Sequence, residues 1–306
     1  MFDRILPYIL AGISVGGQYA LIAVGYTMVY GILRLINFAH GDIFTAAGFF
    51  MVYLTASLPM QISIPLVIVL TVALGFTLER VAYKPLRTAP RMSVMISAIG
   101  ASYLLQNLMW YVTGGLAKQY PVLPWLSDNV QIFTASTKVV TIVTPILTIG
   151  LVIALVMLIK HTKIGMAMRA VSHDFETSQL MGIRINSVIS MTFVIGSGLA
   201  AVGSMLYFTN YSTVTPTVGA MPGLKAFVAA VFGGIGSIPG AVIGAFIIGI
   251  MENIIKGLDV ILFKLGIIAQ PVGLATFSDA FTFALLIIIL IVKPTGLFGE
   301  KVTDKV

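Results

Sequence analysis

Ionisable and polar side chains gather early in the chain, in the stretch GILRLINFAHGD over residues 31–42. His40 and Asp42 do not make a metal site, because two ligands with no third nearby are insufficient. The same pair lacks a plausible nucleophile, so it is not a catalytic dyad. Two interpretations stay open: a discontinuous helix that lines a path or contacts a partner, and an ordinary cytoplasmic turn between two spans. The polar residues concerned are Arg34, Asn37, His40 and Asp42.

The rest of the chain carries no recognisable catalytic or nucleotide-binding motif. A Walker A sequence, a GxSxG elbow and an HExxH pair are all missing. The lack of cysteine excludes disulfides, thiolate metal sites and thiol catalysis. Most carboxylates fall in predicted loops or at helix ends, and we place the exception, Glu252, at the membrane interface. With no clear carboxylate in mid-span, the chain is unlike an ion-driven carrier, and we expect it to hold no catalytic residue, metal or cofactor.

A second group of charges lies in residues 160–185, KHTKIGMAMRAVSHDFETSQLMGIRI. The flanking ranges 139–159 and 186–224 contain no Asp, Glu, Lys or Arg, so this stretch must lie at a membrane surface. Its basic residues place it on the cytoplasmic side. A short amphipathic helix over 167–181 would be suited to docking a partner protein, and the alternative is a solvated loop that merely obeys the positive-inside rule. The apolar contacts of that helix are Met168, Val171, Phe175 and Leu180.

The elements that position these residues are membrane helices. The chain is 58% hydrophobic and only 9% charged, whereas soluble domains are about 45–50% apolar and about 25% charged. The apolar stretches predict an all-α polytopic membrane protein with roughly eight to ten transmembrane or re-entrant helices. We expect one permease domain over residues 1–306. The distribution of basic residues places the loop at 79–91, the stretch 160–185 and the C-terminus in the cytoplasm.

Glycine-rich breaks occur at two places along the chain. FAHGDIFTAAGFF (38–50) and IGSIPGAVIGAFI (235–247) each have Gly or a polar residue just before a helix of small residues. This weak similarity suggests a two-fold internal pseudo-repeat. Unwound breaks at corresponding points of two halves build the substrate path in transporters, although ordinary packing seams also use small residues. The residues expected near such a path are Asn37, His40, Gly41, Gly233, Gly234 and Ser237.

Several stretches together resemble one family. GGQYALIAVGYTMVYGILRLINFAHGDIFTAAGF (16–49) is similar to the opening of the LivH-type permeases of high-affinity branched-chain amino acid ABC importers. GMAMRAVSHDFETSQLMGI (165–183) resembles that family's cytoplasmic loop that engages the ATPase. FVAAVFGGIGSIPGAVIGAFIIGIMEN (227–253) and KPTGLFG (293–299) also match.

The resemblance implies a pore-forming subunit in a bacterial inner membrane. Its partners would be a LivM-type second permease, two cytoplasmic ATP-binding subunits that hold ATP and Mg, and an extracytoplasmic binding protein. We expect import of Leu, Ile or Val; related permeases handle urea or short amides. An ion-coupled secondary carrier and an assembly protein without transport remain as alternatives. The residues expected to couple ATP hydrolysis to transport are Arg169, Ala170, His173, Asp174 and Gly182.

Overall fold

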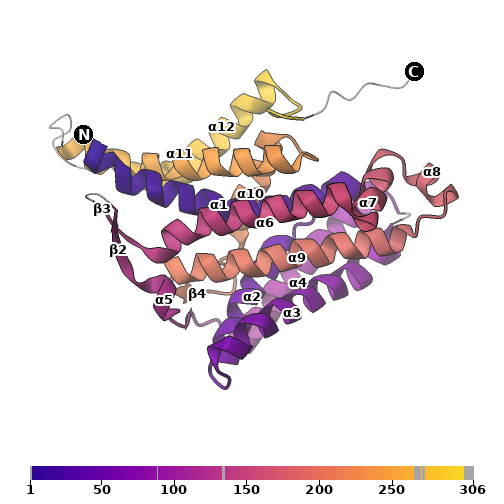
Figure 1. Cartoon of the computed structure of the whole chain (residues 1–306), viewed down its shortest axis with the longest axis horizontal. Coiled ribbons are helices and arrows are strands. Elements are labelled where there is room, and N and C mark those ends of the chain that lie inside the picture. Colours follow the sequence, from indigo (N-terminus) through magenta and orange to yellow (C-terminus); the bar gives the residue numbers. More distant parts are fainter. Residues whose placement is uncertain (1, 88, 133–134, 265–269, 271–272, 300–306) are drawn as a thin grey trace.

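The computed structural model describes residues 2–87, 89–132, 135–264, 270 and 273–299, and this part of the chain is almost entirely helical (Figure 1). Seven helices within it are long and apolar enough to cross a membrane. Two shorter helices, α2 (His40–Thr55) and α10 (Ala220–Gly233), pack among them. Seven spans and two shorter helices make nine, within the predicted range. The prediction of an all-α polytopic membrane protein is confirmed.

The long helices are joined by short elements. The long helices are α1 (Phe2–Leu33), α3 (Met60–Leu78), α4 (Arg91–Thr113), α6 (Val139–His161), α9 (Ile185–Asn210), α11 (Ile238–Lys264) and α12 (Ser278–Val292). A π-helical turn (Glu79–Tyr83) and a 3₁₀ turn (Lys84–Leu86) continue α3, and a 3₁₀ turn (Leu274–Phe277) precedes α12. The remaining elements are α5 (Pro124–Ser127), α7 (Lys163–His173), α8 (Phe175–Leu180), β1 (Lys118–Gln119), β2 (Asn129–Ile132), β3 (Ala135–Lys138) and β4 (Thr213–Val214). Strand β1 pairs with β4 and β2 with β3, both antiparallel.

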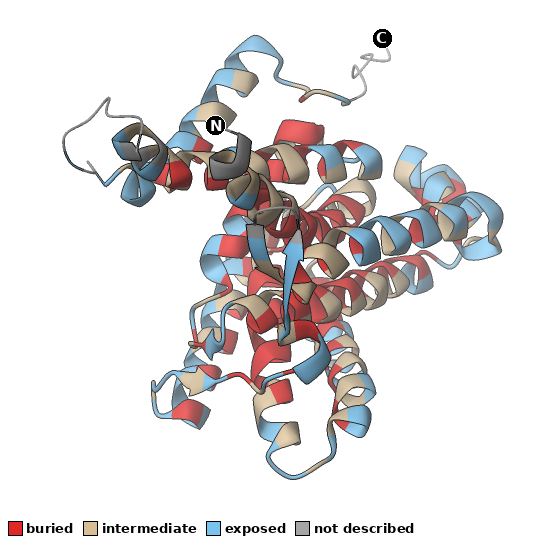
Figure 2. Ribbon diagram, turned by 60° about the vertical axis from the view of Figure 1, so that its left-hand side comes forward, coloured by how far each residue is buried: buried red, intermediate tan, exposed pale blue. Residues whose placement is uncertain are grey.

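The core of the bundle forms around α1, which packs against α6, α9, α10 and α11. Buried residues concentrate in the middle of the bundle, where the helices lie against one another (Figure 2). The middle of α1, Ala20–Val24, is completely buried. Helices α2 and α3 pack on α9, and α4 packs on α2. By contrast, α12 lies at the edge of the bundle with most of its residues exposed (Figure 1). The chain therefore surrounds its first helix with the later ones.

Glycines allow α1 and α11 to touch along their backbones. A Cβ atom built on Gly249 would lie 2.3 Å from the Gly16 nitrogen, and one built on Gly12 would lie 2.7 Å from the Ile250 Cα. Any side chain at these positions would push the two helices apart. The glycines at this contact therefore allow close packing of the two helices.

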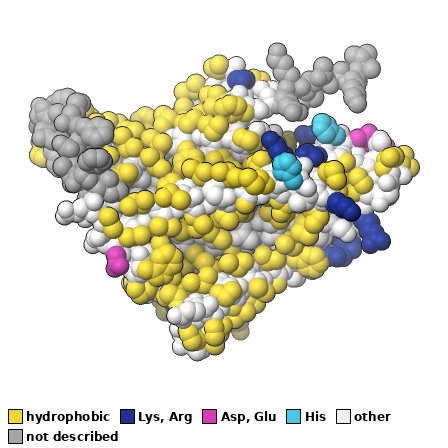
Figure 3. Space-filling view, in the orientation of Figure 1, with side chains coloured by type: hydrophobic (Ala, Val, Ile, Leu, Met, Phe, Trp, Pro, Cys, Tyr) yellow, Lys and Arg dark blue, Asp and Glu magenta, His cyan; other side chains and the backbone are white. Residues whose placement is uncertain are grey.

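Charged side chains gather at one end of the molecule. Figure 3 shows Lys, Arg and His side chains at the end that carries α7 and α8, while the sides of the long helices are hydrophobic. This distribution is what a bundle with apolar sides in lipid and one basic end in water requires.

Candidate functional site

The polar stretch at residues 31–42 forms a break between α1 and α2 inside the bundle. Helix α1 ends at Leu33, and Arg34 follows with a φ of 54°, a conformation that is uncommon for a residue other than glycine. The chain is then unwound until His40 starts α2. The exposed fractions of Asn37, His40 and Asp42 are 1%, 2% and 1%. An ordinary surface turn would leave these side chains in water, so the structure favours the discontinuous helix.

Asn37 and His40 are both held by neighbouring side chains. The Tyr83 hydroxyl donates a hydrogen bond to Asn37 Oδ1 over 2.6 Å. The His40 ring meets the Tyr26 ring edge to face, with 5.0 Å between the ring centroids. A Cβ atom on Gly25 would collide with His40 Nε2 at 2.2 Å, so the imidazole fills the space that this glycine leaves. Both residues are therefore packed in place beside the break.

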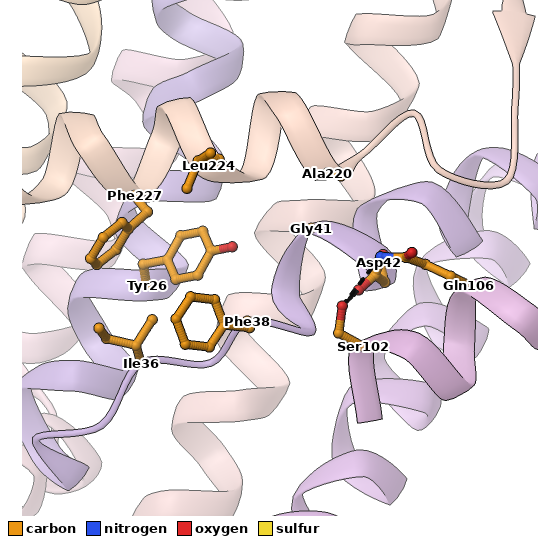
Figure 4. Close-up of a pocket in the computed structure, with 10 residues that line it drawn as sticks. All are labelled: Tyr26, Ile36, Phe38, Gly41, Asp42, Ser102, Gln106, Ala220, Leu224 and Phe227. Carbon is orange, nitrogen blue, oxygen red and sulfur yellow. Dashed lines mark hydrogen bonds between the residues drawn. The ribbon is translucent and has the colours of Figure 1, made fainter. Parts of the chain in front are cut away.

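A pocket of about 180 Å³ opens where α1, α2, α4 and α10 meet (Figure 4). Aromatic and aliphatic side chains line one end, and the hydroxyl, amide and carboxylate of three polar residues lie at the other (Figure 4). Small-molecule sites commonly combine a mostly apolar wall with a few placed polar groups. The lining residues are Tyr26, Ile36, Phe38, Gly41, Asp42, Ser102, Gln106, Ala220, Leu224 and Phe227.

Asp42 is the charged group of this pocket, and α4 supplies its partners. Ser102 Oγ donates to Asp42 Oδ2 over 2.5 Å, and Gln106 Nε2 donates to Asp42 Oδ1 over 2.9 Å. Ser102 and Gln106 are four residues apart, so one face of α4 presents both donors. Asp42 also lies in the first turn of α2, where the helix dipole favours a negative charge.

Gly41 brings the start of α2 against the start of α10. A Cβ atom on Gly41 would lie 2.6 Å from the Gly219 carbonyl oxygen, and one on Gly223 would lie 3.0 Å from the Gly41 Cα. Two helix starts can meet this closely only where side chains are absent. This contact fixes the position of Asp42 relative to the α10 side of the pocket.

The second glycine-rich break forms the turn between α10 and α11. Gly234 adopts a φ of 104°, and a Cβ atom on Gly233 would lie 2.0 Å from the Gly240 carbonyl oxygen. The Ser237 hydroxyl accepts a hydrogen bond from the Gly240 amide over 3.2 Å. The C-terminal stretch packs on this turn, since the Phe298 amide donates to the Gly233 carbonyl over 2.9 Å. These glycines serve a tight turn and the docking of the segment after α12.

The structure thus brings together only part of the predicted substrate path. Of the six residues, Gly41 lines the pocket, Asn37 lies in the adjoining break, and His40 is the first residue of α2. Gly233, Gly234 and Ser237 lie at the opposite end of α10 from the pocket residue Ala220. The assignment of all six to a path stays a prediction.

The stretch 160–185 does not form one helix over 167–181, and that prediction is wrong. Asp174 is extended and interrupts it, because its side chain caps α8 instead: Oδ1 accepts from the Thr177 amide over 3.0 Å and Oδ2 from the Thr177 hydroxyl over 2.6 Å. Met168 on α7 is buried as predicted. Phe175 and Leu180 on α8 are 42% and 87% exposed, so they do not anchor the stretch.

The residues predicted to couple the chain to an ATPase lie along this stretch. Ala170 is half-buried, whereas Arg169, His173, Asp174 and Gly182 are exposed. Gly182 closes the stretch with a φ of 82°. Arg169 also lines a cavity of about 120 Å³ together with Gly236, so α7 adjoins the turn between α10 and α11. Their role in coupling stays a prediction.

Glu252, which we expect at the membrane interface, is buried among other helices of the bundle, and its depth in the membrane stays a prediction. Glu252 is 1% exposed near the middle of α11. Its Oε1 lies 2.7 Å from Lys225 Nζ and 2.5 Å from Lys256 Nζ, and its Oε2 accepts from the Tyr19 hydroxyl over 3.0 Å. Lys225 itself is buried in α10. The sequence of one apolar stretch does not show this pairing, because the lysine that neutralises the buried carboxylate comes from another helix.

Burial within the bundle is a separate question from position along a span, and three carboxylates are buried in the described part of the chain. Besides Asp42 and Glu252, Glu79 is completely buried. It forms an ion pair with Arg87 and accepts a hydrogen bond from the Ser190 hydroxyl over 2.8 Å. The described part of the chain has no cluster of three or more His, Cys, Asp or Glu residues that could hold a metal ion.

Sequence reasoning missed Ser102 and Gln106, the two partners of Asp42 on α4. One signal was present: they are polar residues four positions apart in an apolar span, and such residues usually face the interior of a bundle. Tyr26 and Phe227 were also missed, and no signal separates them from other aromatic residues of buried helices.

Comparison with known proteins shows the family. Residues 8–290 match the family described as "Branched-chain amino acid transport system / permease component". The high-affinity branched-chain amino acid transport system permease protein LivH of Escherichia coli (strain K12) is 38% identical, over 100% of this chain and 99% of that protein. The corresponding permease protein BraD of Pseudomonas aeruginosa is also 38% identical, over 98% of each. The ribose import permease protein RbsC of Haemophilus influenzae is 27% identical, over 79% of this chain and 75% of that protein. The resemblance noted in the sequence is confirmed, and the chain belongs to the family of permease components of branched-chain amino acid transport systems.

Proposed function

We propose that this chain is the membrane-spanning permease subunit of an ATP-driven, binding-protein-dependent importer of the branched-chain amino acids Leu, Ile and Val. One observation carries the proposal: the chain is 38% identical, over essentially its full length, to two proteins named as permeases of branched-chain amino acid transport. In this proposal the chain forms part of the transport pathway and catalyses no reaction itself.

Partner subunits supply the energy in this proposal. The sequence has no nucleotide-binding motif, so ATP and Mg belong to two cytoplasmic ATP-binding subunits. These dock on α7 and α8, where Leu180 and Met181 are 87% and 79% exposed. A LivM-type second permease completes the pore, and an extracytoplasmic binding protein delivers the substrate. The assembly lies in a bacterial inner membrane with the C-terminus of this chain in the cytoplasm.

The pocket composition supports an amino acid over a neutral polar substrate. A branched-chain amino acid combines an ammonium group with an apolar side chain, and the pocket combines Asp42 with aromatic and aliphatic walls. Urea and short amides have no side chain that would use those walls and no charge that would pair with the carboxylate.

Co-purification tests the proposal. The tagged chain is extracted from its native membrane in mild detergent, and the polypeptides that remain bound are identified by mass spectrometry. We expect two copies of ATP-binding polypeptide and a second permease. A lone chain or a homo-oligomer, reproducible across mild detergents, would overturn the proposal in favour of an ion-coupled carrier, with Asp42 and Glu252 as its candidate ion sites.

A further inference from the structure

Asp42 differs from the other buried carboxylates in its partners. Glu79 is paired with Arg87, and Glu252 is paired with two lysines. Asp42, although only 1% exposed, accepts hydrogen bonds from the neutral groups of Ser102 and Gln106. Within the ranges that the structure describes, no lysine, arginine or histidine forms an ion pair with it.

A buried carboxylate without a cation is costly, because it loses hydration that two neutral donors do not replace. Ionisable groups inside membrane proteins therefore mark substrate or ion paths more often than structural positions. Each carboxylate oxygen can accept more than one hydrogen bond, so Asp42 keeps acceptor capacity beyond Ser102 and Gln106. The structure thus presents a carboxyl group beside a cavity, without a cation from the described part of the chain, so that a cation in the cavity can become its partner.

The shape of the cavity indicates what that partner carries. In Figure 4, Asp42 lies with Ser102 and Gln106 at one end, while Ile36 and Phe227 lie at the other. The volume of about 180 Å³ is smaller than the roughly 300–1,000 Å³ of pockets for drug-sized ligands. A small molecule with a positive charge at one end and an apolar group at the other matches this division. A bare inorganic cation would leave the apolar end unused.

We propose that this pocket binds the substrate during its passage, with Asp42 receiving the ammonium group of an aliphatic amino acid and the aromatic end receiving its side chain. The inference rests on the proposed function and adds a site to it. No basic side chain lines the pocket among the described residues, so the pocket selects by the ammonium group and the side chain and not by the carboxylate.

Photolabelling of the working importer tests the site. The complete complex is reconstituted in liposomes, and its binding protein is loaded with a leucine analogue that carries a photoreactive diazirine in the side chain. The sample is illuminated during ATP turnover, and labelled peptides of this chain are mapped by mass spectrometry. We expect label at the apolar end of the pocket, on Tyr26, within residues 36–38 or within residues 224–227. The labelled positions of the unmodified chain show by themselves whether the substrate enters the pocket, so this test needs no variant.

Variants then test the carboxylate itself. Asp42→Asn keeps the shape and can still accept one hydrogen bond, but it removes the charge, so labelling should fall by about tenfold or more. Asp42→Glu keeps the charge and should retain labelling. Asp128→Asn is the matched control, because Asp128 is exposed in the connection between α4 and α6, and its labelling should equal that of the unmodified chain.

The outcomes separate the site from the proposed function. If the unmodified complex imports the analogue but the label lies elsewhere, or Asp42→Asn is labelled as strongly, the pocket inference falls and the importer stands. Equal labelling of Asp42→Asn would mean that a proton or an inorganic cation neutralises Asp42. If the unmodified complex shows no ATP-dependent uptake of leucine or its analogue, the proposed function falls.

Discussion

The Tyr83 hydroxyl lies 2.6 Å from Asn37 Oδ1, and both residues are 1% exposed. This hydrogen bond joins the end of the α3 extension to the break that precedes α2. Tyr83 also lines a cavity of about 220 Å³ together with Phe175, the first residue of α8. A route therefore runs from the first residue of α8, across this shared cavity to Tyr83, and through one hydrogen bond to Asn37 in the break before α2.

Tyr83→Phe tests this route. The substitution leaves Asn37 Oδ1 buried without a donor, which costs about 1–3 kcal/mol, and it weakens the link between α8 and the break. We expect a modest fall in melting temperature and fewer leucine molecules transported per ATP hydrolysed. Tyr111→Phe is the matched control, because Tyr111 is 88% exposed. An unchanged transport ratio in Tyr83→Phe would show that the route carries no coupling.

The buried charge cluster around Glu252 should act as a structural joint. Lys225 bridges Glu252 on α11 and Asp279 on α12, at 2.7 and 2.6 Å. Glu252→Gln leaves Lys225 buried with one partner fewer, and breaking such a pair costs about 3–5 kcal/mol in the free energy of unfolding. We expect a clear drop in the melting temperature of the detergent-solubilised protein.

The double variant Lys225→Met with Glu252→Leu supplies the comparison for that prediction. Replacing both charges by apolar groups of similar size removes the unpaired ion, so much of the lost stability should return. Should the double variant melt as early as Glu252→Gln, the loss would come from packing and not from an uncompensated charge.

The contact between α1 and α11 predicts a strong effect of one methyl group. In Gly249→Ala the new Cβ would lie 2.3 Å from the Gly16 nitrogen, which is backbone and cannot rotate away. Overpacking of this kind costs about 1–3 kcal/mol, and the melting temperature should fall. Gly150→Ala is the control in α6, where a Cβ meets no atom within 4 Å and a helix gains about 0.5–1 kcal/mol from the change. Equal melting temperatures for the two variants would contradict the close backbone contact.

Cysteine cross-linking tests whether α8 docks an ATP-binding subunit. The chain has no native cysteine, so a single introduced thiol is unambiguous. Gln179→Cys places an exposed thiol on α8, and we expect a cross-link to the ATP-binding subunit. Ser178→Cys is the neighbouring control, because Ser178 is 5% exposed and its thiol should react poorly. A cross-link from Gln179→Cys to the extracytoplasmic binding protein would invert the proposed orientation.

The sequence predicts the bundle well because apolar length and loop charge are local properties. Runs such as 139–159 must be spans, and the basic stretch 160–185 must lie at a surface. The position of the break before His40 also followed from local polarity, although only the structure shows that it is buried.

What could not be predicted depends on contacts between distant residues. Asp42 meets Ser102 and Gln106 from a helix sixty residues later, at separations of 60 and 64. Glu252 is neutralised by Lys225 from another helix. The interruption at Asp174 depends on local sequence, because this aspartate caps the start of α8. The prediction missed it because the helical spacing of apolar residues continues on both sides of Asp174.

Movement of radiolabelled leucine out of liposomes that contain the complete complex tests the central claim most directly. The ATP-binding subunits are oriented outward, the leucine-loaded binding protein is inside, and export of label from the lumen to the outside is followed after ATP is added outside. The account predicts ATP-dependent movement that unlabelled isoleucine and valine reduce by competing for the binding protein, and that urea leaves unchanged. Movement that needs no ATP but follows an ion gradient across the liposome membrane would contradict it.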